Sequence, residues 1–365
     1  MRWIISIPLL LLLGGCADLG YYWHNASGHL SIMNQRTDID ELLADEQLNA
    51  GLRERLLLVQ EIRRFSIARL GLPENDSYDS YVELDRPWVI QNIFAAPEFS
   101  TRLYEWCYPI IGCAAYRGYY DQERLLSYAD KLEADGLEVH IGPVSAYSTL
   151  GWFDDPVLSS FIDWPDYRLA GLLFHELTHQ QIYIDDDTRF NESLASAVQQ
   201  VGTELWLSAN NRDQQLIELS RWQDYRAEVI VLIEAIQGRL GQIYASDIDD
   251  IAKRSNKARI LNESRNMHRE IAAKHGVTGG FTRWFEQDLN NAKIGSISAY
   301  NSWSAAFVNM IRAHDLDFAA FFDYVESIGS LKKPARDACL TAWDQGTVRL
   351  QTNCPPHQVT SATAS

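Results

Sequence analysis

Along the second half of the chain, apolar residues recur every three or four positions, which is the spacing of amphipathic helices. An earlier segment, residues 48–70, has the same spacing and stops at Gly71 with Pro73 beyond, and both are typical signals for a helix end. The further helices that the pattern predicts are 167–184, 191–207, 213–244, 247–275, 292–313 and 317–328. Clusters of Asp, Asn and Gly separate them. The chain after Pro165 is therefore predicted to be almost wholly helical.

Residues 73–120 have a different pattern, with four prolines and many aromatic side chains, which favours loops and short strands. Residues 137–141 and 144–153 alternate in polarity and are rich in β-favouring side chains, so each is predicted to be a strand. The chain has neither an internal repeat nor a linker. We therefore expect one α+β domain, predominantly helical, in which a small sheet leads into a helical body.

The first residues are typical of an export signal. Arg2 is followed by the uncharged, largely apolar segment 3–13, which is too short to cross a bilayer as a helix. Residues 13–16, LGGC, resemble the bacterial lipobox, in which the cysteine is lipidated and becomes the new N-terminus. We therefore expect a lipoprotein whose mature chain begins at Cys16, with an ordinary signal peptide and an unrelated cysteine as the alternative. Because Ala17 rather than Asp follows, the resemblance implies the outer membrane and its periplasmic face.

Four further cysteines follow, and an even number in an exported chain predicts two disulfides. Proximity favours Cys107 with Cys113 and Cys339 with Cys354, although four cysteines allow three connectivities. Neither pair has the spacing of a zinc ribbon or finger, so a metal site built from them is disfavoured.

Composition places the chain among globular proteins. Hydrophobic residues make up 46% of the 365 positions and charged residues only 22%, which excludes a disordered or low-complexity chain. The 49 acidic and 32 basic residues give a formal charge of −17. This charge repels phosphate backbones and no basic run offsets it, so nucleic acid is not expected as a partner.

The strongest chemical signal lies within the predicted helix 167–184, where the sequence HELTH places His175 and His179 four residues apart. On a helix such residues share one face, so both imidazoles can bind one zinc ion while Glu176 lies beside it. Zinc lowers the pKa of a water molecule that it binds, and Glu176 is then the expected general base in attack on an amide carbonyl. The alternative is a helix whose histidines merely cap or pack.

A catalytic zinc ion needs three protein ligands and one open position. Glu192 is the expected third ligand, because it begins the next predicted helix and a helical hairpin can bring its carboxylate back to the metal. Asp185 and Glu204 are the alternatives. Ile182 stands where a glycine would be needed to unwind the helix toward Asp185, which disfavours that residue. We expect one zinc ion per chain.

Other residues could assist the reaction, but their spacing does not place them. Candidates for a hydrogen-bond donor to the oxyanion are Tyr300, His268 and Tyr147. The acidic turn 185–187 could orient a histidine ring or be simply solvated. Residues 144–153 could pair as a strand edge with an extended substrate, or be a plain buried strand. Asp154 or Asp155 could bind the α-amino group of a peptide.

Four blocks of the sequence resemble a known family. They are WCYPIIGCAAYRGYY (106–120), AYSTLGWFDDPVLSSF (146–161), LLFHELTHQQIYIDDDTRFNESLA (172–195) and LNNAKIGSISAY (289–300). Through them the chain is similar to a bacterial lipoprotein family of predicted zinc-dependent aminopeptidases, which are gluzincin-type HExxH metallopeptidases. The resemblance implies a zincin-like fold, zinc bound by His175, His179 and Glu192, and Glu176 as the base.

We therefore expect a signal peptide over residues 1–15 and a single metallopeptidase-like domain over residues 16–365. Its expected parts are an N-terminal helix and loop-rich part (16–120), the sheet and zinc-site helices (121–210) and a helical C-terminal part (211–365). The expected activity is aminopeptidase-like hydrolysis of peptides by a lipid-anchored protein that faces the periplasm. The alternatives are a zinc endopeptidase acting on envelope proteins or cell-wall peptides, and a non-catalytic structural or binding lipoprotein.

Overall fold

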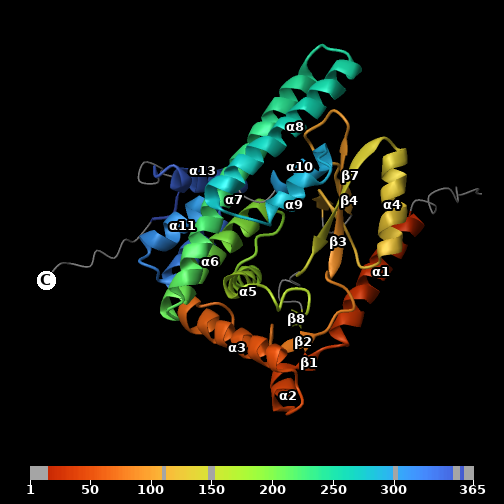
Figure 1. Cartoon of the computed structure of the whole chain (residues 1–365). Helices are drawn as coiled ribbons and strands as arrows, with labels where there is room; N and C mark the ends of the chain where they lie inside the picture. The colour runs from red at the N-terminus through yellow and green to blue at the C-terminus, as the bar shows by residue number, and fades with distance from the viewer. Residues whose placement is uncertain (1–14, 109–111, 147–152, 299–302, 348–353, 357–365) are drawn as a thin grey trace, which may run out of the picture.

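The computed structural model describes residues 15–108, 112–146, 153–298, 303–347 and 354–356 (Figure 1). Within these ranges the helices are α1 (Gly15–Met33), α2 (Ile39–Ala44), α3 (Ala50–Leu70), α4 (Gln122–Ala134), α5 (Asp166–Gln181), α6 (Thr188–Ala209), α7 (Asp213–Ala245), α8 (Asp250–His275), α9 (Phe281–Glu286), α10 (Asn291–Ser298), α11 (Ser304–Ala313), α12 (Phe318–Gly329) and α13 (Lys333–Asp344). The strands are β1 (Thr37–Asp38), β2 (Ser80–Val82), β3 (Ile90–Pro97), β4 (Trp106–Tyr108), β5 (Gly112–Ala114), β6 (Arg117–Tyr119), β7 (Leu137–Val144) and β8 (Val157–Leu158). The predicted class, α+β and predominantly helical, is confirmed.

Most of the long helices follow the hydrophobic pattern. α3, α5, α6, α7, α8 and α12 begin and end within three residues of the predicted positions. Gly71 has a φ of 59° at the end of α3, so it forms the left-handed cap that its position predicted. The helix predicted over 292–313 is instead two helices, α10 and α11, and residues 299–302 between them lie outside the described residues.

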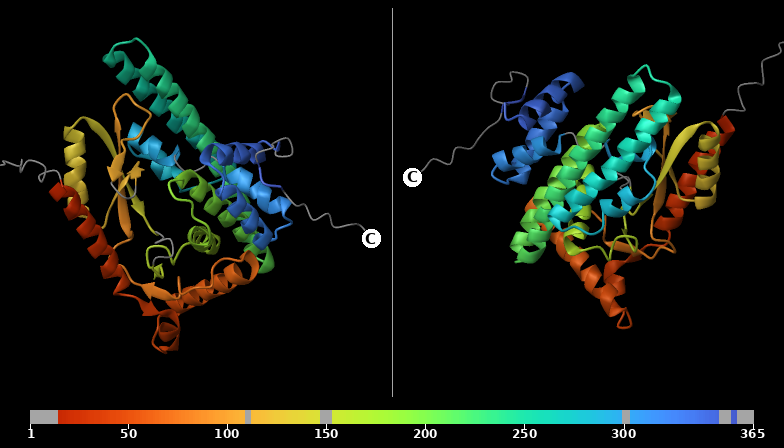
Figure 2. Two further views of the ribbon diagram at one scale, coloured as in Figure 1. Left: turned by 180° about the vertical axis from the view of Figure 1, so that it is seen from behind. Right: turned by 45° about the horizontal axis from the view of Figure 1, so that its top comes forward.

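The central sheet has the order β6-β3-β7, and β3 is antiparallel to both neighbours. Side chains alternate between the two faces of a strand, so β3 contributes to two separate clusters. Ile93 and Ala95 belong to a buried cluster with α4, whereas Phe94 and Ala96 pack with Ala292 of α10. The sheet therefore lies between α4 on one side and α10 on the other, as Figures 1 and 2 show.

The helical body has two cores. The larger core joins α3, α5, α6, α11, α12 and α13 through fully buried side chains such as Phe174, Trp206 and Phe307. The smaller one lies within the long antiparallel pair of α7 and α8, around Tyr225 and Ile233. One end of this pair projects beyond the rest of the molecule (Figure 1). The α5–α6 pair, which carries the HELTH sequence, is thus packed in the larger core.

Some elements differ from the predictions. The helices α1, α2, α4, α9 and α13 were missed, although α4 buries Leu125, Ala129 and Leu132 at the helical spacing i, i+4, i+7. Their short periodic segments lie beside loops, prolines or the export signal, which obscure the pattern. The strand predicted over 144–153 is wrong at 145, 146 and 153, which are not in a strand, and 147–152 lie outside the described residues. No helix among the described residues is both long and apolar enough to cross a membrane.

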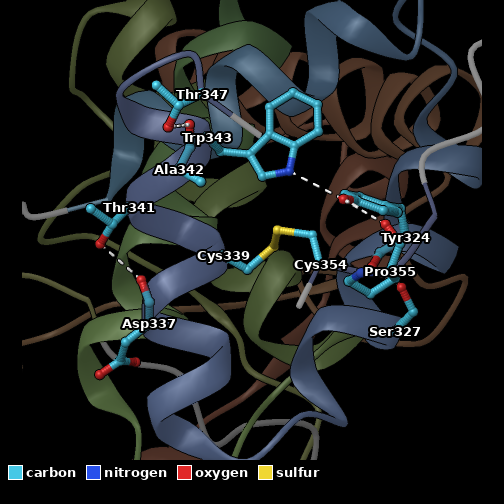
Figure 3. The surroundings of a disulfide bond; sticks show 10 residues. All are labelled: Tyr324, Ser327, Asp337, Cys339, Thr341, Ala342, Trp343, Thr347, Cys354 and Pro355. Atoms are coloured by element: carbon cyan, nitrogen blue, oxygen red, sulfur yellow. Dashed lines mark hydrogen bonds between the residues drawn. A yellow bond between two sulfur atoms is a disulfide. The ribbon is translucent and has the colours of Figure 1, made fainter. Parts of the chain in front are cut away.

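Both predicted disulfides are present. Cys107 and Cys113 face one another across the β4–β5 hairpin. Cys339 on α13 is joined to Cys354, so the chain after α13 is tied back to the helical body (Figure 3). Beside this bond, the indole of Trp343 donates to the Tyr324 hydroxyl, which donates to the carbonyl of Pro355. Two covalent links of this kind are typical of proteins in oxidising compartments.

Candidate metal centre

The HELTH sequence lies on α5, whose opposite face is fixed in the larger core. Leu173, Phe174 and Leu177 are fully buried there, which leaves the histidines on the other side of the helix. Gly171, one turn before His175, lies against α6, where an added Cβ would meet Gln199 and Thr203 at 3.1–3.2 Å. The two helices therefore approach closely at the level of the histidines.

The turn between α5 and α6 is fastened from two directions. The side chain of Asn191 donates to the carbonyl of Ile184 and accepts from its N–H, at 2.8 and 2.9 Å. The carboxylate of Asp187 caps α6 through Phe190 and accepts two hydrogen bonds from Arg336 of α13, at 2.6 and 3.0 Å. Of the acidic turn, Asp185 and Asp186 are exposed, but Asp187 is buried and structural. This anchoring sets where the first turn of α6 lies.

We expect Asp187→Asn to lower the free energy of unfolding by about 3 kcal/mol, because it leaves the buried guanidinium of Arg336 without its counter-charge. Asparagine keeps the capping oxygen, so the loss measures the charge pair. Burial alone raises the pKa of Asp187, but hydrogen bonds from Lys333 and Arg336 hold this pKa below its ordinary value. The contribution is therefore complete above about pH 4 and is lost as the pH falls through the folded pKa.

Urea unfolding at pH 7 checks this prediction. Asp185→Asn is the matched control, since that exposed side chain lies two residues away in the same turn and its loss should change stability by less than about 0.5 kcal/mol. Equal urea midpoints for Asp187→Asn and the wild type would contradict the structural role of the buried pair.

The side chains of His175, His179 and Glu192 converge across the α5–α6 pair. The two Nε2 atoms are 3.3 Å apart, and the Glu192 carboxylate oxygens lie 3.4 Å from Nε2 of His175 and 3.7 Å from Nε2 of His179. Within the described part of the chain, this is the group of histidine, cysteine and acidic side chains that could surround a metal ion. Two imidazole nitrogens and a carboxylate are a donor set that catalytic zinc uses.

Gln199, which the sequence analysis did not single out, orients one of the rings. Its Oε1 lies 3.1 Å from Nδ1 of His175. An amide oxygen can only accept, so in the neutral ring Nδ1 carries the proton and Nε2 keeps its lone pair toward Glu192 and His179. Gln199 follows Glu192 by seven residues, which is two helical turns on the same face of α6, and this spacing was the signal that could have revealed it.

The pKa values of the cluster residues differ from their ordinary values. Burial and the neighbouring His175 lower the pKa of His179 to about 4, so its imidazole is neutral at pH 7. Burial lowers the pKa of His175, but the carboxylates of Glu192 and Glu176 outweigh it and raise that pKa above its ordinary value. Burial raises the pKa of Glu192, yet the two histidines bring it below its ordinary value. The cluster thus combines a neutral imidazole with a carboxylate that remains ionised.

Glu176 lies beside His175 but is not one of the three side chains, His175, His179 and Glu192, that converge. It is 9% exposed, and burial raises its pKa to about 7, with a smaller contribution from Glu192 and Asp155. Asp155 is itself buried, and Gln180 of α5 donates to its carboxylate at 3.3 Å. A carboxyl group with a pKa near neutrality can both accept and return a proton, which is the property required of a general base.

Two tyrosines that the sequence analysis missed lie near Glu192. Burial, followed by the charge of Glu192, raises the pKa of both Tyr116 and Tyr183. The ring of Tyr183 is 6.4 Å from that of His179, four residues earlier in the chain. Both side chains are also partly exposed, at 39% and 43%, so each presents its ring at the surface beside the cluster.

The other candidate residues lie elsewhere. His268 is buried in the α7–α8 core, where its ring stacks on Phe285 and its Nε2 is 2.7 Å from the hydroxyl of Tyr225. Glu204 is three turns beyond Glu192 on α6, and exposed Asp185 is not in the converging group. Asp154 is exposed and its carbonyl accepts from Arg36. The last two candidates, Tyr147 and Tyr300, are outside the described residues.

Comparison with known proteins gives one match. The model of a family described as "Putative aminopeptidase" matches residues 20–340, which include the α5–α6 pair, the central sheet and most of the helical body. No curated protein and no solved structure matches the chain. A match over so much of the chain shows the family, and the family's description is that of a peptide hydrolase. The chain therefore belongs to the Putative aminopeptidase family.

Proposed function

We propose that the protein is a zinc-dependent aminopeptidase with a zincin-like domain of gluzincin type. His175, His179 and Glu192 bind one zinc ion per chain, and Glu176 is the general base. The observation that carries the proposal is the convergence of these three ligand side chains from two neighbouring helices, with a buried carboxyl group beside them.

The separations in the cluster fit this metal. Ligand atoms arranged tetrahedrally at about 2.1 Å from zinc are about 3.4 Å from one another. The three closest separations between ligand atoms of different residues are 3.3, 3.4 and 3.7 Å. The ring tautomer set by Gln199 and the low pKa of His179 both leave a lone pair for a metal, since zinc binds neutral imidazole.

The chain's own residues then account for proton movement. Zinc, when bound, would activate a water molecule and polarise the scissile carbonyl. Glu176 accepts a proton from the attacking water and returns it to the leaving amine. Its burial supports this role, because a pKa of about 7 balances the two proton transfers at neutral pH. Asp155, a buried acid whose charge acts on Glu176, is the group that we propose to bind the substrate's α-amino group.

We also propose that the protein is a lipoprotein, with a signal peptide over residues 1–15 and a single domain over residues 16–365. Lipidation of Cys16 would anchor it at the periplasmic face of the outer membrane. The two disulfides support an exported location, since such bonds form and persist in oxidising compartments.

Purified native protein tests the proposed function through metal analysis and digestion of an unbiased peptide mixture. We expect one equivalent of zinc, and release of N-terminal residues from free peptides but not from amino-blocked ones. Cleavage of blocked peptides would show an endopeptidase instead. Native protein without zinc, or zinc-loaded protein that cleaves no peptide, would contradict the proposal.

A further inference from the structure

A second feature adjoins the candidate metal centre. It is a cavity of about 270 Å³ between α5, α6, α7 and the start of α11. Its lining includes Gln199, the residue whose side chain contacts His175. Leu172 and Ser196 also line it, one helical turn from Glu176 on α5 and from Glu192 on α6. The cavity therefore lies near the cluster, along the same two helices.

The size of the cavity limits what can enter it. Its volume is slightly below the roughly 300–1,000 Å³ that is usual for sites of drug-sized ligands, so it suits a side chain or one end of a peptide. Tyr167, Trp222 and Leu219 supply apolar surface for such a group. These side chains come from α5 and α7, which contact one another in the fold.

The charge of the cavity is unusual for this protein. Two arginines, Arg168 on α5 and Arg226 on α7, line it, and none of its described lining residues is acidic. The whole chain, in contrast, has 49 acidic and 32 basic residues. Arg168 lies over the ring of Trp164 at 4.4 Å, and no carboxylate among the described residues is within ion-pair distance of it. The cavity therefore offers positive charge on apolar, aromatic walls.

We propose that this cavity is a substrate subsite that binds a carboxylate group near the scissile bond. The inference rests on the proposed function, because it assigns the subsite to the reaction at the neighbouring cluster. Guanidinium groups match carboxylates in shape and charge, and both arginines are exposed, so that an incoming carboxylate can reach them. The carboxylate can come from an Asp or Glu side chain or from the C-terminus of a short peptide. The enzyme accordingly prefers acidic peptides to their neutral isosteres.

Matched peptides test this subsite on zinc-loaded protein. One series replaces Glu by Gln at each position flanking the cleaved bond, and another replaces the free C-terminus by an amide. We expect kcat/KM to be at least about tenfold higher for the acidic member of one series, mainly through a lower KM. A preference in the first series identifies a side chain as the source of the carboxylate, and a preference in the second identifies the C-terminus. Equal rates in both series would overturn the inference.

Variants connect the preference to the cavity. In Arg168→Gln and Arg226→Gln, the ratio of kcat/KM for acidic and neutral peptides should fall about tenfold. Arg221→Gln is the matched control, because Arg221 is exposed on α7, as Arg226 is, but does not line the cavity, so the ratio should stay at the wild-type value. An unchanged ratio in both cavity variants would place the recognition elsewhere and overturn the proposal.

A binding measurement separates this inference from the proposed function. Calorimetric titration of zinc-loaded Glu176→Gln with the same peptide pairs requires no turnover. Tighter binding of the acidic peptide, lost in the double variant with Arg168→Gln, supports the subsite even if the wild type cleaves nothing. Equal affinities for acidic and neutral peptides overturn the subsite even if the wild type is an active peptidase.

Discussion

Replacing Glu176 with glutamine is expected to lower kcat for peptide hydrolysis by about 10² to 10⁴-fold while zinc binding is retained. Glutamine has the shape of glutamate but cannot accept the proton of the attacking water. The carboxyl group is not one of the three converging ligand side chains, so its loss leaves them in place. Steady-state rates on a peptide substrate, together with the zinc content of the same preparation, measure both parts of the prediction.

The combination of results is what distinguishes a general base from a ligand or a structural residue. Activity near the wild-type level in Glu176→Gln would exclude Glu176 as the base. Loss of zinc together with activity would show instead that the carboxyl group holds the site together.

The metal-free protein provides a second readout on the same variant. Burial raises the pKa of Glu176 to about 7, so between pH 4.5 and 7 the folded state binds more protons than the unfolded state. The free energy of unfolding therefore falls as the pH rises through this window. Metal-free Glu176→Gln avoids this loss, and we expect its urea midpoint to exceed that of the wild type at pH 8 but not at pH 4.5.

Helical periodicity alone was enough to predict the parts of the site that lie on one element. His175 and His179 are one turn apart on α5, so their convergence needs nothing beyond the helix. The same periodicity located the long helices, because their apolar faces are buried in the two cores. The cysteine pairs also followed from short separations in sequence.

Contacts between distant segments could not be predicted in this way. The position of Glu192 depends on a turn that Arg336 fastens from 149 residues away, through a carboxylate that looked like part of a solvated acidic turn. The spacing of residues in the sequence gave no indication that Tyr116, from the segment after β5, lies close enough to Glu192 for the charge of Glu192 to raise the pKa of Tyr116. The arginine-lined cavity likewise combines α5, α6 and α7, and becomes visible only when these helices are packed together.

Glu192→Gln is expected to weaken zinc binding by at least about 100-fold and to abolish peptide hydrolysis at limiting zinc. Glu192 is the ionised member of the cluster, and its oxygens lie 3.4 and 3.7 Å from the Nε2 atoms of the two histidines. A neutral amide of the same size removes the charge that attracts the dication and offers a weaker donor. Zinc affinity from competition with a fluorescent chelator, measured beside peptide hydrolysis, checks both effects.

Glu204→Gln is the matched control for this variant, because Glu204 is another partly buried carboxylate on α6 and lies three turns from the cluster. If Glu192 acts only by adding to the negative charge of the protein, Glu192→Gln and Glu204→Gln lower the zinc affinity equally. If Glu192 is a ligand, Glu204→Gln binds zinc like the wild type, and excess zinc restores part of the activity of Glu192→Gln. Wild-type zinc affinity in Glu192→Gln would show that Glu192 is not the third ligand. That result would contradict the proposed catalytic centre.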